Sequence, residues 1–557
     1  RSGLDQVHDY ALDLKNFHLG SHQCHIVPIL IPTETKQLNQ SCQFEKDKVA
    51  SPVTISPEKL VALISETLRI HNNGSIISND WSSSGYKPTP TIIQAAEALF
   101  AGHSVKEITR SESGAINLDK TASAALTAIN KAKINKKKSL IFITGVPGSG
   151  KTLAGLEIAT SSRRKSDSDN EGVFLTGNGP LADVLREALA RDEVERTAVT
   201  KTEAMRNAKT FIQNIHHFRN EYLTDTNPPF EKVVVFDEAQ RAWNVAATSS
   251  YMNKKYSITD FNQSEPEFLL SVMARHPDWC AVVCLIGNGQ EINSGEAGVS
   301  EWIKAAEELE DNWNISFSDQ LYEYEEGETS GLFQNFNPSS ISHSPELHLK
   351  TSIRSFRSER LSEYVGKILD GDAEQANNIS LDLKDYPLLI SRNISQAKKW
   401  LKMVSRGSER YGLVASSNAI RLKPYGLHMK SKIHPASWFL GDKDDVRSSF
   451  YLEDAASEFD IQGLELDWIG ICWDANLRRN NSDWNFHKFM GTKWKNINKP
   501  ENQSYLINSY RVLMTRARQG MVIFVPEGDK ADHTRKPEFY NPIYDYLLCC
   551  GFTELHL

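Results

Sequence analysis

The sequence of 557 residues lacks long hydrophobic runs, cysteines in C-x-x-C spacing and an excess of basic charge. No apolar run approaches the roughly 18 residues that a membrane-spanning helix needs, and no secretory signal opens the chain. We therefore expect a cytoplasmic protein that contacts no membrane. The seven cysteines include no C-x-x-C pair, and an odd number suits a reducing compartment better than a disulfide framework. A net charge of -8 argues against a surface that coats polyanions throughout, but it leaves room for a local basic groove.

Residues 140–152 hold the feature around which the chain is organised. They read Leu-Ile-Phe-Ile-Thr-Gly-Val-Pro-Gly-Ser-Gly-Lys-Thr, an apolar strand that breaks into G-x-x-x-x-G-K-T before a helix-compatible segment. Glycines let backbone amides approach phosphate oxygens, the lysine neutralises them, and the threonine hydroxyl binds Mg²⁺. A structural turn is the alternative, but strand, loop and helix in this order favour a site for ATP and Mg²⁺. The predicted nucleotide-binding residues are Gly145, Gly148, Gly150, Lys151 and Thr152.

A second stretch, residues 232–241, contains an apolar run that ends in two adjacent carboxylates, Asp237 and Glu238. Asp237 at the strand tip could hold Mg²⁺, and Glu238 could orient and deprotonate the attacking water. Adjacent like charges are costly unless a cation shares them, so an incidental pair at a buried strand end is the poorer interpretation. A third run, residues 281–286, leads to Gly-Asn-Gly-Gln, where Gln290 would sense the terminal phosphate or the water.

These motifs, in this order, resemble the first half of a superfamily 1 helicase motor. Further along, residues 352–357, 458–467 and 510–518 resemble motifs IV, V and VI of the same motors. With the segment 412–417, they resemble a bacterial group of helicase-like ATPases related to the Schlafen helicase domain. Members of that group often carry a RecB-like nuclease segment in front. The resemblance runs from about residue 145 to residue 526.

The resemblance implies roles for residues outside the first three motifs. Arg354 and Arg516 would act as arginine fingers that stabilise charge on the transferring phosphoryl group. Surface ion pairing is the alternative for both. Gln240, Gly463 and Glu465 would join the residues that bind the nucleotide.

We expect an α/β fold with two tandem RecA-like parallel-sheet domains behind a small N-terminal α/β domain that is nuclease-like. The predicted parts are an N-terminal domain at 1–80, a helical linker at 81–125, and RecA-like domains at 126–345 and 346–557. Processive helicases of this superfamily carry large inserted domains, whereas residues 307–338 form only an acidic, polar insert. Strand separation is therefore a weaker expectation than ATP-driven movement.

The first helix predicted from the sequence carries Gln6 and Tyr10 on one face. The pair resembles the Q-x-x-x-Y element of RecB-type nucleases, and a surface helix with an incidental Gln and Tyr is the alternative. In such nucleases an acidic residue and an E-x-K strand come first, and neither precedes Gln6. Asp13 and Lys15 are poor substitutes, because a lone helix-borne carboxylate lacks partners for a metal. Since the sequence opens at Arg1 rather than Met, we expect a trimmed chain that hydrolyses ATP but does not cut DNA.

Three further features have plainer interpretations. Cys24 lies between His22 and His25, but without a second Cys/His pair nearby we expect ordinary packing rather than a metal site. The lysine-rich residues 131–138 suit a solvated helix end better than a binding patch. The aromatic and polar residues of 211–222 could stack on bases, although a plain amphipathic helix fits them as well.

The function we predict is a nucleic-acid-dependent ATPase that translocates on or unwinds DNA or RNA. The loops at 176–179 and 415–417 would line a groove that faces away from the ATP and holds the partner, for which single-stranded DNA is the first choice. Coupling to a nuclease in bacterial anti-phage defence or DNA repair is expected, with a homo-oligomer or a defence-system protein as further partners. The alternative is an ATP-driven regulatory switch or assembly scaffold that nucleic acid triggers without unwinding.

Overall fold

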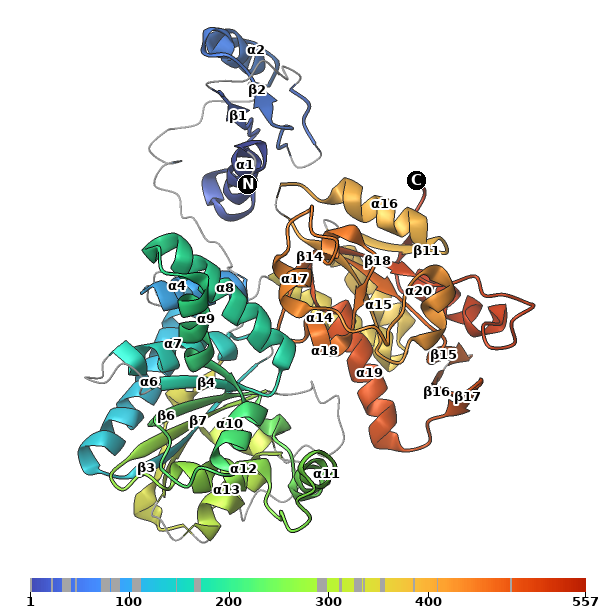
Figure 1. Ribbon diagram of the computed structural model, residues 1–557. Coiled ribbons are helices and arrows are strands. Elements are labelled where there is room, and N and C mark those ends of the chain that lie inside the picture. The colour runs from blue at the N-terminus through green and yellow to red at the C-terminus, as the bar shows by residue number, and fades with distance from the viewer. Residues whose placement is uncertain are drawn as a thin grey trace.

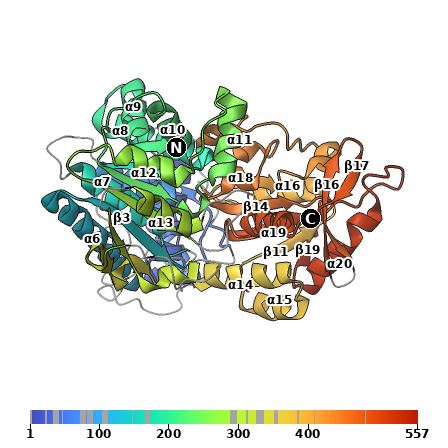
Figure 2. The ribbon, with the colours of Figure 1, turned by 90° about the horizontal axis from the view of Figure 1, so that it is seen from below.

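The computed structural model describes most of the chain and shows two bodies, each built on a parallel sheet (Figure 1, Figure 2). The described residues are 3–21, 24–32, 42–45, 48–71, 81, 91–102, 112–146, 148–164, 172–287, 298–309, 313–324, 333, 336–350, 356–383, 386–407, 409–480 and 483–557. The expected α/β class with parallel sheets is confirmed.

The first sheet has eight strands in the order β5-β4-β6-β7-β3-β8-β9, with β10 paired to β3. All of its strand pairs are parallel. The central strands are buried on both faces, which explains why they read as continuous apolar runs. The strands are β3 (Lys138–Gly145), β4 (Gly172–Thr176), β5 (Ile212–Asn214), β6 (Val233–Asp237), β7 (Cys280–Ile286), β8 (Trp313–Phe317), β9 (Ile341–His343) and β10 (His348–Leu349).

Helices cover both faces of this sheet, because alternate strand residues point to opposite sides. Ile141 and Ile143 pack under one helical layer, while Leu140 and Phe142 pack under the other. The first layer holds α4 (Ile92–Ala101), α6 (Glu112–Asn135), α7 (Lys151–Arg164), α8 (Gly179–Thr197) and α9 (Lys201–Phe211). The second holds α10 (Ile215–Tyr222), α12 (Glu265–Met273) and α13 (Gly298–Glu308), and α11 (Val245–Tyr256) lies beyond it.

The second sheet has six strands in the order β13-β12-β14-β18-β11-β19, again all parallel. They are β11 (Leu388–Ser391), β12 (Tyr411–Ala415), β13 (Ala455–Ala456), β14 (Leu466–Cys472), β18 (Ala517–Phe524) and β19 (Thr553–Glu554). The surrounding helices are α14 (Phe356–Asp370), α15 (Ala373–Ser380), α16 (Ile394–Val404), α17 (Pro435–Leu440), α18 (Glu458–Ile461), α19 (Pro500–Met514) and α20 (Asn541–Cys549). Apolar residues of α8 and of α17 and α18 belong to one buried cluster, so the two bodies are packed together.

A small antiparallel sheet interrupts the second body between β14 and α19. Its strands are β15 (Leu477–Asn480), β16 (Asp483–Met490) and β17 (Lys493–Asn496). In both ribbon views β16 and β17 lie on the side of the second body that faces away from β3 and β6 (Figure 1, Figure 2).

The N-terminal segment lies apart from the two sheets (Figure 1). It contains α1 (Gly3–Phe17), the parallel pair β1 (Ile29–Leu30) and β2 (Val53–Thr54), and α2 (Leu60–His71). The helix predicted around Gln6 and Tyr10 is confirmed, and the Gln6 amide donates to the Tyr10 hydroxyl at 3.0 Å on its exposed surface. The nuclease role of this pair stays a prediction.

The structure describes Cys24 and the lysine-rich residues 131–138, while His22 lies outside the described residues. The Cys24 thiol donates to the Gly20 carbonyl at 3.1 Å, and no group of three or more metal-binding side chains occurs among the described residues. Of the lysine-rich stretch, Lys138 donates to the Ala274 carbonyl at 2.6 Å, while Lys136 and Lys137 are exposed at the end of α6. In the described ranges, no helix is long and apolar enough to cross a membrane.

Candidate functional site

The candidate site lies where β3, β6 and β7 end, at the centre of the first sheet. Because parallel strands end at the same edge of a sheet, the loops that follow these strands meet there. The loop after β3 turns through Gly148 (φ +76°) and Gly150 (φ +86°) and enters α7 at Lys151. Only glycine adopts such left-handed angles readily, so this turn requires glycine at both positions.

Lys151 folds back over its own loop. Its ammonium donates to the Gly145 carbonyl at 2.8 Å and to the Val146 carbonyl at 3.3 Å. A Cβ on Gly145 would lie 2.6 Å from the Ser149 hydroxyl oxygen and 2.7 Å from Leu349 Cβ, so the packing admits only glycine. Among the described residues, the Ser149 hydroxyl is buried without a hydrogen-bond partner. The loop therefore presents a cation and a spare hydroxyl together, which suits an anion such as a phosphate group.

Asp237 lies opposite this loop at the tip of β6. Its carboxylate is 3% exposed and accepts from the Thr152 hydroxyl, which lies 3.3 Å from both oxygens. Burial and then the neighbouring Glu238 carboxylate raise the pKa of Asp237 to about 7, against the opposing effects of Thr152 and Lys151. A divalent cation would relieve this unfavourable burial, so Thr152 and Asp237 could together hold Mg²⁺.

Glu238 is fixed by a strained backbone and by Gln240. Its φ of +53° lies in the left-handed region, which is costly for a residue with a side chain. The Gln240 amide donates to the Glu238 carboxylate at 2.5 Å and accepts from the Gly287 backbone N–H at 3.0 Å. Gln240, predicted to bind the nucleotide, thus links Glu238 to the end of β7.

Gly287 brings the three strand ends into contact. A Cβ added to it would lie 3.3 Å from both the Glu238 carboxylate and Lys151 Cε. Strain at Glu238, held from two sides, is typical of a group that must keep one orientation for chemistry. Gln290, three residues further on, lies outside the described residues, and so does Arg354.

A cavity of about 300 Å³ extends from this edge into the space between the two bodies. Thr152, Asp237 and Glu238 line its first end. Phe459 and Gly463, from the segment that precedes β14, line the other. The loop at 176–179 also lines this cavity, beside the predicted ATP-binding residues, whereas the sequence predicted that it faces away from the ATP. The cavity is therefore shared by residues that are more than 200 positions apart in the sequence.

Gln462 makes the polar contacts across this cavity. Its carbonyl accepts from the Asn178 amide at 2.7 Å, and its side-chain oxygen accepts from the Arg241 guanidinium at 2.5 Å. The side-chain amide nitrogen of Gln462 is buried without a partner in the part of the chain that the structure describes. Asn178, Arg241 and Gln462 were not predicted as site residues, although each lies beside or within a motif that the sequence shows.

Gly463 lies against α8 of the first body. Its φ is +78°, and a Cβ there would meet Leu181 Cδ2 of α8 at 3.1 Å. Glu465, also predicted to bind the nucleotide, is half-buried just before β14. Arg516 is 4% exposed between α19 and β18, and its backbone carbonyl accepts from the Leu466 N–H at 3.0 Å. The segments that resemble motifs V and VI are thus hydrogen-bonded side by side.

A buried carboxylate supports the second predicted loop. Glu458 is 1% exposed and accepts from both the backbone N–H and the hydroxyl of Ser417 at 2.7 Å. Burial raises the pKa of Glu458, and the Ser417 hydrogen bonds oppose that effect. The loop at 415–417 is therefore held against α18, one residue before Phe459 enters the cavity wall.

The segment 211–222 is mainly a core element. Phe211, Phe218 and Tyr222 are buried, so they cannot stack on bases. The alternative of a plain amphipathic helix is wrong as well, because the segment contains the end of α9, the strand β5 and the helix α10. His216 does line the cavity, where burial, followed by the nearby Arg219 charge, lowers its pKa to about 4. The Arg219 guanidinium, fully buried, pairs with Glu265 at 3.2 Å and stabilises this wall.

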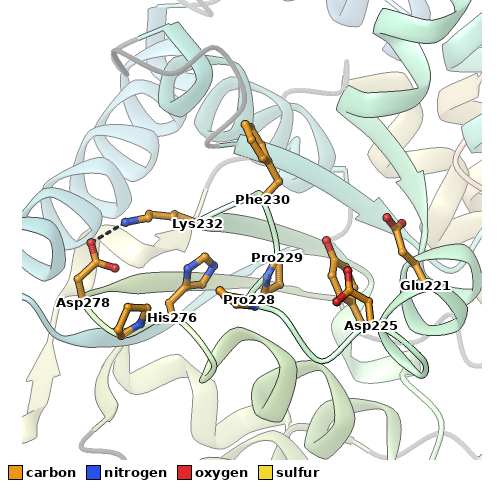
Figure 3. Close-up of a pocket in the computed structure, with 10 residues that line it drawn as sticks. Glu221, Asp225, Pro228, Pro229, Phe230, Lys232, His276 and Asp278 are labelled. Carbon is orange, nitrogen blue, oxygen red and sulfur yellow. Dashed lines mark hydrogen bonds and ion pairs between the residues drawn. The ribbon is translucent and has the colours of Figure 1, made fainter.

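A larger surface depression of about 660 Å³ lies at the opposite edge of the first sheet, before β6 and β7 begin (Figure 3). Lys232 and Asp278 form an ion pair at 2.5 Å on one side, with Glu221 and Asp225 on the other. None of the predicted site residues lines it. Its prolines and acidic rim offer no anion-binding loop, so the chemistry belongs to the carboxyl edge of the sheet.

Most of the chain matches a known family model. Residues 138–527, from the first residue of β3 to just beyond β18, match the family model described as Schlafen group 3, DNA/RNA helicase domain. The match covers more than half of the chain and places it among proteins with a helicase domain. More particularly, the chain belongs to the Schlafen group 3 helicase family. A search of curated proteins finds no match.

Proposed function

We propose that the protein is an ATP hydrolase of the superfamily 1 helicase type, with tandem RecA-like domains that move along nucleic acid. The observation that carries the proposal is the shared cavity, which runs from the Thr152–Asp237 pair to Phe459 and Gly463 of the second body. A site with walls from two bodies ties the state of its ligand to their relative position. This is the property that a nucleotide-driven motor needs.

The residues present fit ATP and Mg²⁺. Lys151 would neutralise the terminal phosphates, and the buried Ser149 hydroxyl offers them a further donor. Thr152 and Asp237 would hold the cation, whose charge lowers the barrier to phosphoryl transfer. Glu238, fixed by Gln240, would take the proton of the attacking water.

The second body would complete the reaction. Arg516 and Arg354 would stabilise the charge that develops on the transferring phosphoryl group. When the cavity closes, movement of Gly463, Glu465 and Gln462 would be transmitted to the second sheet. Because Gln462 already bonds to the loops after β4 and β6, a small movement there changes contacts on both sides.

The proposed partner is a single strand of DNA or RNA, with DNA as the first choice. The loop at 415–417, held against α18 through Glu458, would contact the strand, and the loop at 176–179 would reach it from beside the ATP. Bacterial defence or DNA repair, a RecB-like nuclease fold around Gln6 and Tyr10, and an oligomer or partner protein are further parts of this proposal. These parts rest on the resemblance of the sequence to the Schlafen-related group of helicase-like ATPases.

A strand-displacement assay separates this function from a regulatory switch. A motor releases a labelled strand from a tailed duplex only when ATP is present, and tails of opposite polarity give different rates. A switch instead changes its oligomeric state with nucleotide and releases no strand. Directional displacement supports the motor, and nucleotide-dependent assembly without displacement supports the switch.

Lys151→Ala is expected to weaken ATP binding and abolish turnover. Removing one partner of a buried charge pair costs roughly 2–5 kcal/mol, so the loss of affinity should be large. Calorimetric titration with Mg·ATP measures it. Lys254→Ala, an exposed lysine on α11, is the matched control and should bind as the wild type does. Equal affinity of Lys151→Ala and the wild type would refute the phosphate site.

Gly463→Ala is expected to impair turnover beyond its effect on stability. A left-handed angle costs a side-chain-bearing residue roughly 1–2 kcal/mol, and the new Cβ would also press on Leu181. Gly426→Ala is the control, since its φ of +85° is similar and nothing lies within 4 Å of the added atom. Urea unfolding should show similar losses for both variants, while ATP turnover should fall only in Gly463→Ala. Equal turnover in the two would mean that the contact between the bodies is irrelevant to catalysis.

A further inference from the structure

The β16–β17 hairpin presents lysines on one face. Lys488 lies directly opposite Lys495 in the antiparallel register, and Met490 lies opposite Lys493. Directly opposed side chains share a face of the sheet, and so do residues two apart, so these four side chains lie together. All four are exposed. The segment from Trp484 to Pro500 contains four lysines and no Asp or Glu, in a chain whose net charge is -8.

The opposite face of the hairpin is anchored to the body. Phe489 and Trp494 form a cross-strand aromatic pair with ring centroids 5.2 Å apart. The Trp494 indole donates to the Thr534 carbonyl at 2.7 Å, and the Arg478 guanidinium lies 5.1 Å from the Trp494 ring. Arg421 packs over Phe489 at 5.2 Å. With Phe489 and Trp494 packed in this way, the hairpin holds Lys488, Lys493 and Lys495 exposed at its end on a fixed support.

The lysine pair is unfavourable for the isolated chain. Opposed residues in an antiparallel sheet have Cβ atoms only about 4.5–5.5 Å apart, and like charges at that distance destabilise the pairing. Within the described part of the chain, no carboxylate forms an ion pair with Lys488, Lys493 or Lys495. A polyanion bound across both strands would remove the repulsion, so the arrangement is complementary to a row of phosphates.

We infer that the lysine face of this hairpin binds the phosphodiester backbone of the nucleic acid, outside the cavity between the two bodies. The inference rests on the proposed function and adds a second contact to it. In both ribbon views the hairpin lies apart from α18 and β6, which contribute to the cavity wall, so it would bind a separate segment of the nucleic acid (Figure 1, Figure 2). It also connects β14 directly to α19, and therefore joins the segments that resemble motifs V and VI.

The test is salt-dependent binding of fluorescein-labelled single-stranded DNA, followed by anisotropy without ATP. Each phosphate contact on a single strand contributes about 0.7 to the slope of log affinity against log salt concentration. Lys488→Gln with Lys495→Gln should therefore lower that slope by about 1.4 and weaken binding at low salt. Lys399→Gln with Lys402→Gln, an exposed pair on α16, removes the same charge and should leave the slope unchanged. Basal ATP turnover without DNA should equal that of the wild type in both variants.

A charge reversal separates binding from folding. Lys488→Glu places opposite charges across the strands, so the melting temperature should rise or stay the same while DNA binding weakens. A hairpin needed only for folding would lose stability and binding together, which would overturn the inference. A wild-type slope in the Lys488→Gln, Lys495→Gln variant would also overturn it while the proposed function stands, and would favour an acidic protein partner. If the α16 control variant lost as much of the salt slope, DNA would be attracted by the overall charge and not by the hairpin, and the inference would be overturned too. Absence of DNA and RNA binding by the wild type would overturn both proposals.

Discussion

Glu238→Gln is expected to bind Mg·ATP as tightly as the wild type and to hydrolyse it roughly 10²–10⁴ times more slowly. The substitution keeps the shape of the side chain and an oxygen that can accept from the Gln240 amide, which lies 2.5 Å from the carboxylate. It removes the base that would take the proton of the attacking water. Loss of turnover without loss of binding is the result expected for a group that acts only in the chemical step.

The measurement pairs ATP titration with steady-state phosphate release. Glu221→Gln is the matched control, because Glu221 lies in the depression at the opposite edge of the same sheet. That variant should retain full turnover. Hydrolysis by Glu238→Gln at a rate near that of the wild type would show that the assignment of the base is wrong.

Arg516→Ala should reduce the turnover rate by about 10³-fold or more, the effect typical of an arginine finger. Affinity for ATP should change much less, since the charge that Arg516 would stabilise develops mainly in the transition state. Arg516→Lys should not restore the rate, because an ammonium cannot reproduce the planar two-donor fork of guanidinium.

Arg518→Ala controls for the loss of a nearby cation. Arg518 follows Arg516 by two residues. Its guanidinium lies 3.7 Å from the Asp467 carboxylate, and we expect it to serve that ion pair. Its removal should leave turnover within a few-fold of the wild type. A crystal structure with Mg²⁺ and a non-hydrolysable ATP analogue provides the direct view. If the Arg516 guanidinium stays out of hydrogen-bonding reach of the terminal phosphate in a closed cavity, the assignment fails.

The strands that build the site could be predicted because their burial is directly visible in the amino-acid sequence. β3, β6 and β7 are covered on both faces, so each reads as an unbroken apolar run. The polar residues that follow such runs must meet at one edge. This is why Lys151 and Asp237 could be assigned to one site from the sequence.

Contacts that depend on packing between distant segments could not be predicted in the same way. Gln462 bonds to Asn178 and Arg241 across more than 200 residues, and nothing local to any of the three specifies the distance. The role of Gln240 as the support of Glu238 likewise needed the position of Gly287. Arg354 and Gln290 lie outside the described residues, and their roles stay predictions.

The lysines of the β16–β17 hairpin show a different limit of prediction from the sequence. Lys488 and Lys495 are seven residues apart, and only the strand register puts them opposite each other. A shift of one residue would place them on opposite faces. Gly491, with a φ of +62°, fixes the turn and therefore the register. The composition alone could show a basic stretch, but not a repulsive pair.

The most direct measurement of the central claim is ATP turnover by the wild-type chain with single-stranded DNA, duplex DNA and RNA in parallel, beside no nucleic acid. We predict slow basal hydrolysis and strong stimulation by at least one single strand, with Glu238→Gln inactive throughout. Turnover that is the same with and without every nucleic acid would contradict a motor that couples the two bodies to a bound strand.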